Sequence, residues 1–308
     1  MTLTLAVCLK PTWRTDTVVR LSESGKSVRA DGAAPGLSTL DAGVLAQALA
    51  LKTSLESAGG SIRLQALTVG PPSALPLLRE ALAAGVDESI RVWTSGSTSD
   101  TPGELDGSAT STWRCAGLVA QAMRPAKTSG PLLVLAGESS SDEGHGSFGA
   151  FVAQALGVDF AHRTTSLAAT GSGWLAHVKL ERGYTQELEL EASAVVTMAN
   201  QGLKLADASW PTWLASRTES IPTLTVDYAE GAIPVPASVT VLRPPVPRVK
   251  RYRVPSSSLP AEARIRSLVG EKPQGGGQVF PASGGLDRQV EAVISLLKSR
   301  GFHAGKRI

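Results

Sequence analysis

The residues that point most clearly to chemistry lie in one stretch, between Leu132 and Gly149. An apolar run over 132–136 is typical of a buried strand, and the loop after it is rich in Gly, Ser and Asp. Small residues let a backbone approach a ligand closely, and free amides at the start of a following helix favour a phosphate. We therefore expect a nucleotide-binding loop. An ordinary solvated loop is the alternative, because neither GxGxxG nor a Walker A sequence is present.

Two other loops are expected at the same edge of a sheet. Gly70-Pro71-Pro72 follows the apolar run 66–69, and the segment 36–41 precedes a helical pattern. Ligands of open α/β sheets bind beyond the carboxyl ends of the strands. The three loops would therefore line one crevice.

Residue sets typical of catalysts are missing. The four histidines form no HExxH or HxH pattern, and there is no GxSxG elbow or inward carboxylate cluster. Cys8 and Cys115 are distant thiols without CxxC spacing, so we interpret them as core residues of a protein in the reducing cytoplasm. We expect no catalytic residue and no metal site, which fits a binding subunit better than an enzyme.

The elements that must position these loops alternate between strands and helices. This order is typical of an α/β fold: a Rossmann-like open, mostly parallel sheet with helices on both faces. We expect strands over 3–9, 62–69, 90–92, 132–136 and 194–197. We expect helices over 41–52, 73–84, 110–123 and 147–156, with Ser38 or Thr39 capping the first and Gly85 ending the second.

One section departs from this alternation of strands and helices. Residues 174–181 and 186–191 alternate apolar and polar side chains, and a turn glycine, Gly183, lies between them. This pattern predicts an antiparallel hairpin with one wet face at an edge of the sheet.

Beyond residue 230 the composition changes. Prolines and a run of basic residues indicate an extended arm, Gly275-Gly276-Gly277 a joint, and the last segment an amphipathic helix. We expect two parts, an α/β nucleotide-binding domain over 1–230 and a Pro-rich arm with a docking helix over 231–308. The basic run carries a single aromatic residue, so we interpret it as a solvated arm, with a nucleic-acid patch as the weaker alternative. The helix stripe consists of Leu286, Val290, Val293, Ile294 and Leu297.

Overall composition is that of an ordinary globular protein. Of 308 residues 42% are hydrophobic and 19% charged, and the net charge of +3 is too small to predict binding to nucleic acid or membranes. No apolar run approaches the roughly 20 residues of a membrane span, and the N-terminus lacks the basic region of a signal peptide.

In order along the chain, these segments resemble the electron transfer flavoprotein beta subunit family. Val7-Cys8-Leu9-Lys10 is similar to its VAVKR strand, residues 36–52 to its SMNPFDEIAVEEALRLK segment, and residues 78–87 to its LRTALAMGAD stretch. Residues 137–149 fit the spacing of its GKQAIDDDxxQTG nucleotide loop. The segment before Thr197 is similar to its KLPAVVT, and Ala208-Ser209-Trp210-Pro211 to its partner-recognition ATLP.

The resemblance implies a heterodimer with an alpha subunit that holds most of an FAD, while this chain binds AMP or a second FAD. The dimer would carry electrons from flavin-dependent dehydrogenases to a quinone oxidoreductase or a similar acceptor. It also implies the nucleotide contacts, many of them through the backbone: Cys8, Ser38, Thr39, Leu40, Asp41, Val69, Gly137, Glu138, Ser139, Ser140, Ser141, Asp142, Glu143, Gly144, His145, Gly146, Ser147 and Phe148.

The sequence also departs from the family pattern. Ser147-Phe148 replaces a Gln-Thr pair, so one hydroxyl at the helix start is missing, and Trp210 replaces the partner-facing leucine. We expect Trp210 and Trp213 to be exposed anchors for a partner, since aromatic residues are enriched at binding hot spots; packing in the core is the alternative.

Two other function classes stay open at this point. One is a stand-alone adenine-nucleotide sensor, because the same fold serves that role. It gains nothing from a long arm and a docking helix. The other is a small-molecule enzyme with a nucleotide substrate, which the absence of an acid–base set disfavours.

Overall fold

The computed structural model describes residues 2–13, 19–21, 28–30, 35–94, 112–226, 257–269 and 285–299. The chain divides into two units, Met1–Pro244 and Pro245–Ile308. The domain boundary predicted after residue 230, the Pro-rich arm and the Gly-rich joint all lie outside the described residues, and the boundary stays a prediction.

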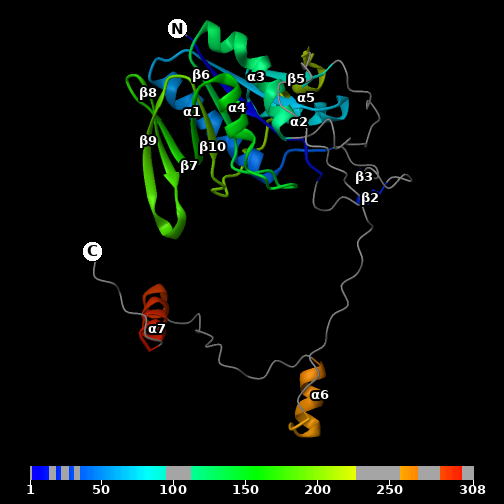
Figure 1. Ribbon diagram of the computed structural model, residues 1–308, viewed down its shortest axis with the longest axis vertical. Coiled ribbons are helices and arrows are strands. Elements are labelled where there is room, and N and C mark those ends of the chain that lie inside the picture. The colour runs from blue at the N-terminus through cyan, green and yellow to red at the C-terminus, as the bar shows by residue number, and fades with distance from the viewer. Residues whose placement is uncertain are drawn as a thin grey trace. The chain divides into compact units, whose positions relative to one another are not determined.

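The first unit is built on a nine-stranded sheet (Figure 1). Its order is β11-β5-β4-β1-β6-β10-β7-β8-β9, parallel from β11 to β7 and antiparallel from β7 to β9. This is the open α/β fold that the sequence predicts. The strands are β1 (Leu3–Cys8), β4 (Ile62–Val69), β5 (Glu88–Trp93), β6 (Leu132–Gly137), β7 (Asp159–Ala169), β8 (Gly173–Lys179), β9 (Thr185–Glu191), β10 (Ala194–Met198) and β11 (Thr223–Thr225). A separate pair is formed by β2 (Val19–Leu21) and β3 (Val28–Ala30).

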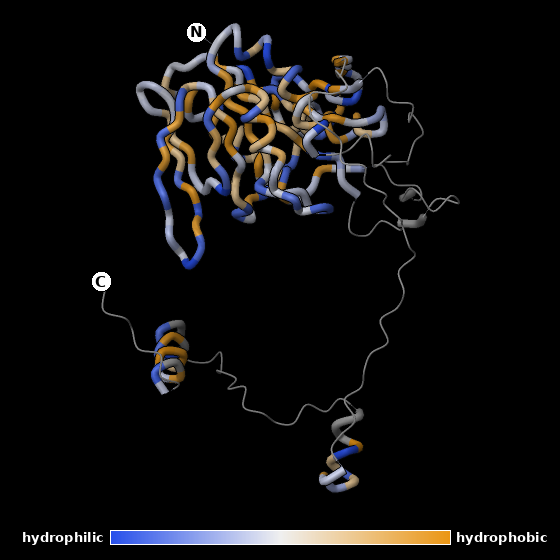
Figure 2. Tube along the Cα trace, viewed as in Figure 1, coloured by the Kyte–Doolittle hydropathy of each residue, from blue (hydrophilic) through white to orange (hydrophobic). Residues whose placement is uncertain are grey.

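Helices cover both faces of the sheet, because the strands are apolar on both sides (Figure 2). One core forms where α1 (Thr39–Ser57) and α2 (Leu75–Ala84) meet side chains such as Leu5, Val7 and Leu64. The other forms where α3 (Thr112–Ser129) and α4 (Phe148–Leu156) meet Ala6, Cys8 and Val134. The alternation of side chains along β1 thus fills two cores at once.

Local signals set the helix ends. Ser38 caps α1 by accepting a hydrogen bond from the backbone N–H of Asp41 at 3.0 Å. A turn of 3-10 helix, η1 (Pro72–Ala74), precedes α2, which ends at Gly85 with a φ of 111°. The Gly85 stop was predicted, and Ser38 is one of the two caps that the sequence predicted, the other being Thr39. The helices α1 and α3 run several residues beyond their predicted ends, and α3 contains Pro125.

The edge hairpin has its predicted form. Strands β8 and β9 pair antiparallel, and a turn of 3-10 helix, η2 (Glu181–Gly183), joins them. The long strand β7 beside them was not predicted from the sequence. One half of it pairs parallel with β10 and the other half pairs antiparallel with β8. A strand with two different neighbours does not keep one alternating pattern. Strand β11, which has three exposed residues at the other edge, was not predicted either.

The order of the strands puts a topological switch point beside β1, where the sequence predicts a ligand crevice. From β1 the chain moves outward to β4 and β5, then returns to β6 on the other side of β1. The connections at the carboxyl ends of β1 and β6 therefore leave in opposite directions. In open α/β sheets this switch point is where ligands bind.

A long connection leads from β10 to the far edge of the sheet. Its first part, residues 199–209, is called the strap here; it passes over α1, where the carbonyl oxygen of Leu203 lies 3.3 Å from the Cβ position of Gly43. The helix α5 (Trp210–Thr218) follows and packs on α2. Arg79 of α2 donates hydrogen bonds to the carbonyl oxygens of Ser216 and Glu219 at 2.6 and 3.1 Å, which fixes the end of α5.

In the part of the second unit that the structure describes, residues 257–269 and 285–299, there are two helices, α6 (Ala261–Val269) and α7 (Gly285–Ser299). The predicted final helix corresponds to α7. Its residues Val290, Val293 and Ile294 are exposed and form an apolar stripe that is visible along the helix (Figure 2). Among the helices that the structure describes, none is long and apolar enough to cross a membrane.

The helix α4 lies unusually close to the sheet at Gly149, which is buried. A Cβ atom at this position would lie 2.4 Å from Cγ2 of Thr197 and 2.9 Å from Cε2 of Phe160. Both neighbours belong to strands, β10 and β7, so they have little room to move. Glycine here sets the height of α4 above the sheet.

We predict that Gly149→Ala destabilises the fold by about 2 to 3 kcal/mol, because the added methyl group overpacks a filled contact. Urea unfolding of the full chain measures this. Gly171→Ala is the matched control, since no heavy atom lies within 4 Å of its Cβ position and its φ is not in the left-handed region. Equal stability of the two variants would contradict the prediction.

Candidate functional site

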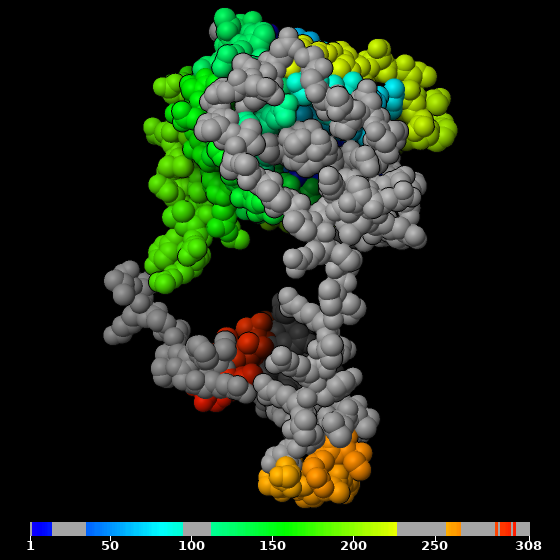
Figure 3. Space-filling model, turned by 45° about the vertical axis from the view of Figure 1, so that its right-hand side comes forward, coloured from blue at the N-terminus to red at the C-terminus, as the bar shows by residue number. Residues whose placement is uncertain are grey.

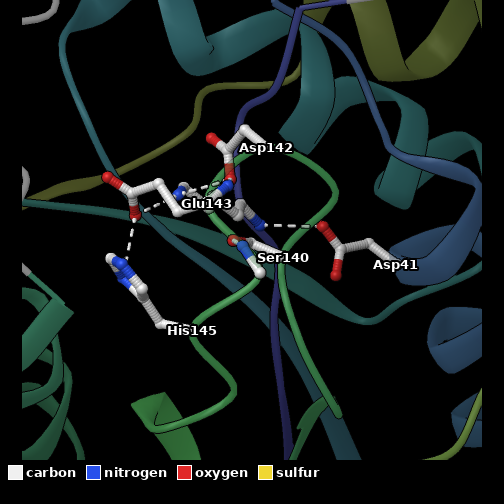
Figure 4. Close-up of polar contacts among 7 residues, drawn as sticks. Asp41, Ser140, Asp142, Glu143 and His145 are labelled. Atoms are coloured by element: carbon white, nitrogen blue, oxygen red, sulfur yellow. Dashed lines mark hydrogen bonds and ion pairs between the residues drawn. The ribbon is translucent and has the colours of Figure 1, made fainter.

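The loops of the predicted crevice are linked by Lys10, which follows β1. Its Nζ lies 2.8 Å from Oδ1 of Asp142 and 3.0 Å from Oε2 of Glu143, both in the loop after β6 (Figure 4). The side chains of Lys10 and Asp142 are 36% and 41% exposed, so each ion pair contributes at most about 1 kcal/mol. Their importance is positional: they hold the predicted nucleotide loop against the end of β1.

The same residue ties down the start of α1. The backbone N–H of Lys10 donates to Oδ2 of Asp41 at 3.1 Å, and Asp41 is almost fully buried. Burial raises the pKa of Asp41 to about 6, against the lowering effect of the hydrogen bonds from Lys10 and Ser38. Asp41 therefore titrates close to neutral pH, inside the crevice.

The loop after β6 is shaped by hydrogen bonds and by glycine. Ser140 Oγ accepts from the N–H of Gly144 at 3.2 Å, and Asp142 Oδ1 accepts from the N–H of Glu143 at 2.7 Å. Gly144 and Gly146 have φ values of 68° and 67°, a region that other residues rarely adopt. Without these glycines the loop would not reach the start of α4 in this form.

The electrostatics of the loop follow from its contact with Lys10. Burial alone raises the pKa of Asp142, but hydrogen bonds from Lys10 and Ser140 outweigh it, so the pKa lies below its usual range. Burial likewise lowers the pKa of Lys10, and its bonds to Asp142 and Glu143 reverse this and raise it. Lys10 and Asp142 are therefore both charged at neutral pH.

The loop ends at α4, whose first residue is Phe148. Ser147 occupies the capping position, yet its side chain makes no capping hydrogen bond. First-turn N–H groups without a side-chain acceptor can bind an anion. The start of α4 therefore suits a phosphate even though Phe148 contributes no hydroxyl.

The structure brings many of the predicted contact residues together. Leu40 packs its Cγ and Cδ2 3.1 Å from the Cβ position of Gly137, so the start of α1 touches the start of the loop. Cys8 ends β1 and is buried, and burial raises the pKa of its thiol to about 12. Val69 ends the neighbouring strand β4, and Thr39 is exposed. The remaining predicted contacts, from Glu138 to Phe148, form the loop itself.

Three residues of the site were not singled out from the sequence. Lys10 was considered only as part of the segment that resembles the family's first strand. A lysine directly after a buried strand could have indicated its contact with the loop. His162 and Thr197 lie on the adjacent strands β7 and β10. No motif marks His162, and Thr197 was noted only as the end of the segment similar to KLPAVVT. Within the described part of the chain, no group of three His, Cys, Asp or Glu side chains is arranged to hold a metal ion.

Two open hollows lie away from this crevice, beside the second half of α4. They have volumes of about 520 and 590 Å³ and share Gln154 and Gly157 in their lining. Lys127 lines one of them and donates hydrogen bonds to the carbonyl oxygens of Leu156 and Gly157, which caps the end of α4.

Comparison with known proteins decides the family. Residues 30–228 match the model of the electron transfer flavoprotein domain, a segment that includes the loop after β6 and all of α5. The chain is also similar to the electron transfer flavoprotein subunit beta of Methylophilus methylotrophus, with 27% identity over 199 residues, 63% of this chain and 68% of that protein. The chain belongs to the electron transfer flavoprotein family.

Within the electron transfer flavoprotein family it is a divergent, beta-like member. Its α5 carries the segment that resembles the partner-recognition motif. Trp210 and Trp213 are 70% and 38% exposed and stack with ring centroids 4.9 Å apart. The guanidinium of Arg217 lies 4.9 Å from the centroid of the Trp213 ring. The two tryptophans therefore lie on the surface and not in the core. In Figure 3 the segment that includes α5 is drawn in yellow-green, at the upper right of the view.

We predict a pH dependence of stability from Asp41. Its pKa is about 3.9 in an unfolded chain and about 6 in the fold. Because the folded pKa is the higher one, the fold binds the proton more tightly. This stabilisation is fully present below pH 4 and is lost as the pH rises through 6, a change of about 3 kcal/mol.

Asp41→Asn removes this titration. Unfolding free energies of both chains, measured from pH 4 to pH 7.5, are expected to differ by an amount that grows with pH in favour of the variant. Asp207→Asn, at an exposed position of the strap, is the control. A difference that does not change with pH would contradict the raised pKa.

Proposed function

We propose that this chain is the beta subunit of a heterodimeric electron transfer flavoprotein. Its partner is an alpha-type subunit that holds most of an FAD, and the chain alone has no catalytic activity. The heterodimer carries electrons from flavin-dependent dehydrogenases to a quinone oxidoreductase or a similar acceptor. Family membership supports the electron-transfer role.

The proposal includes an adenine nucleotide, AMP or a second FAD, in the crevice of this subunit. One observation carries it: the loop 137–148 is held at the topological switch point by Lys10 and delivers the uncapped start of α4 there. The residues present fit such a group, because Gly144 and Gly146 give the loop a backbone path at positive φ that leads to α4, and the first-turn N–H groups of α4 can bind phosphate.

The residues of the crevice have distinct roles in this proposal. Backbone groups of the loop and of the start of α1 bind and orient the nucleotide, which explains why the side chains of Ser139 and Ser141 need not match those of relatives. Lys10 holds the loop in place, and the buried carboxyl of Asp41 fixes the position of Lys10. The bound flavin supplies the redox chemistry.

We predict that the chain co-purifies with the alpha-type flavoprotein subunit encoded in the same organism. Tagged on this subunit, the complex should be yellow and release FAD plus AMP, or two FAD per dimer, when the bound nucleotides are identified by chromatography. Purified alone, the chain should be colourless. If it ignored every alpha-type subunit offered and bound ATP or AMP by itself, the proposal would fail in favour of a nucleotide sensor.

We further propose that the dehydrogenase docks on the Trp210–Trp213 pair. Both rings are exposed, already stacked, and held on a helix fixed by Arg79, so little ordering is needed on binding.

Trp210→Ala combined with Trp213→Ala should raise the KM of the donor dehydrogenase for the heterodimer about 10-fold or more, with the flavin content unchanged. Steady-state reduction of the heterodimer by that dehydrogenase measures this. Trp210→Phe should retain most of the affinity. Tyr184→Ser, at the exposed hairpin turn, is the matched control. Equal KM values for the double variant and the control would refute docking at α5.

A further inference from the structure

His162 and Arg163 form a bulge in β7. The strand pairs Val196 with Ala161 and Met198 with Thr164, so His162 and Arg163 together face the single residue Thr197. Arg163 has a φ of 58°, which is rare for a residue other than glycine, and the buried hydroxyl of Thr164 has no hydrogen-bond partner. Bulges of this kind redirect a side chain next to a site, and here the redirected side chain is that of His162.

Thr197 fixes the orientation of the His162 ring. Its Oγ1 lies 2.8 Å from Nδ1 of His162 and accepts a hydrogen bond from the backbone N–H of Arg163 at 3.3 Å. When the hydroxyl of Thr197 donates its hydrogen to Nδ1, the ring hydrogen lies on Nε2. Burial lowers the pKa of His162, and Arg163 adds to this while Glu138 opposes it. The lowered pKa leaves the ring uncharged at neutral pH.

The ring lies beside the start of α4. Its Cε1 is 4.0 Å from the Cβ position of Gly146, two residues before the helix begins. Phe160, on the same strand, lies one turn further along, against Gly149, and its ring centroid is 6.0 Å from that of His162. The two rings thus follow α4 from its preceding turn into its first turn. His162 is the one that reaches the residues before the helix.

We propose that His162 is a specificity-determining residue that donates a hydrogen bond from Nε2 to the phosphate group of a nucleotide bound at the start of α4. The inference rests on the nucleotide site of the proposed function and adds a ligand contact from a strand outside the loop. Phe148 offers no hydroxyl to the phosphate, and the ring of His162 lies beside Gly146, two residues before Phe148. Arg163 is kept away from this role by its ion pair with Glu138, at 3.3 Å.

Adenosine and AMP differ only in the phosphate group. Comparing their affinities therefore isolates the contribution of contacts to the phosphate. We expect the full-length chain, purified with its alpha-type partner and freed of nucleotide, to bind AMP more tightly than adenosine in calorimetric titrations. His162→Leu should weaken AMP binding about 10-fold and leave adenosine binding unchanged. His162→Gln, which keeps an N–H donor, should recover part of the loss.

The matched control is His177→Leu, a partly exposed histidine on β8 that pairs with Glu187 at 3.8 Å. It should bind both ligands as the unaltered chain does. If His162→Leu bound AMP as well as the unaltered chain, or lost affinity for AMP and adenosine equally, the assignment of His162 would be wrong while the nucleotide site stood. If the unaltered complex bound neither ligand, the nucleotide part of the proposed function would fail together with this inference.

Discussion

The ion pairs of Lys10 with Asp142 and Glu143 link the ends of β1 and β6, the two strands between which the strand order reverses. Each pair is partly exposed and weak, and the linkage works because the backbone of Lys10 is also bound to the buried Asp41. The ends of β1 and β6 and the start of α1 are therefore tied together. The loop that leads to α4 depends on these contacts for its position. A parallel sheet brings these ends to one edge, and Lys10 joins the loops that leave it.

Close packing of α4 against β10 and β7 fixes the position of the helix that follows the loop. Gly149 lets α4 rest on Thr197 and Phe160, and the hydroxyl of Thr197 in turn holds His162 and the backbone of Arg163. One threonine thus fixes both the height of a helix and the direction of an imidazole ring. The cost is visible next to it, in the left-handed backbone of Arg163 and the unpaired hydroxyl of Thr164. Features that cost stability are commonly retained where they serve a site, and these lie beside the predicted loop.

Elements that depend on local chemistry could be predicted from the sequence. Ser38 caps α1, Gly85 ends α2 and the alternating pattern forms the β8–β9 hairpin, because each is decided within a few residues. The bulge in β7 could not be predicted, since it exists only through pairing with β10 on one side and β8 on the other. Lys10, His162 and Thr197 were missed for the same reason: their roles arise from residues more than 30 positions away in the chain.

The same distinction explains how the chain keeps its fold and crevice at 27% identity to a beta subunit. A site that binds through backbone N–H groups constrains the path of the chain and leaves most side chains free. Here the path is fixed by Gly144 and Gly146 at positive φ and by Gly149 against the sheet. Phe148 can then stand at the start of α4, because its amide keeps its position whatever side chain it carries. Divergence is therefore expected to concentrate in the side chains that face a ligand or a partner, such as His162 and the two tryptophans of α5, and to spare the glycines and the lysine that hold the loop.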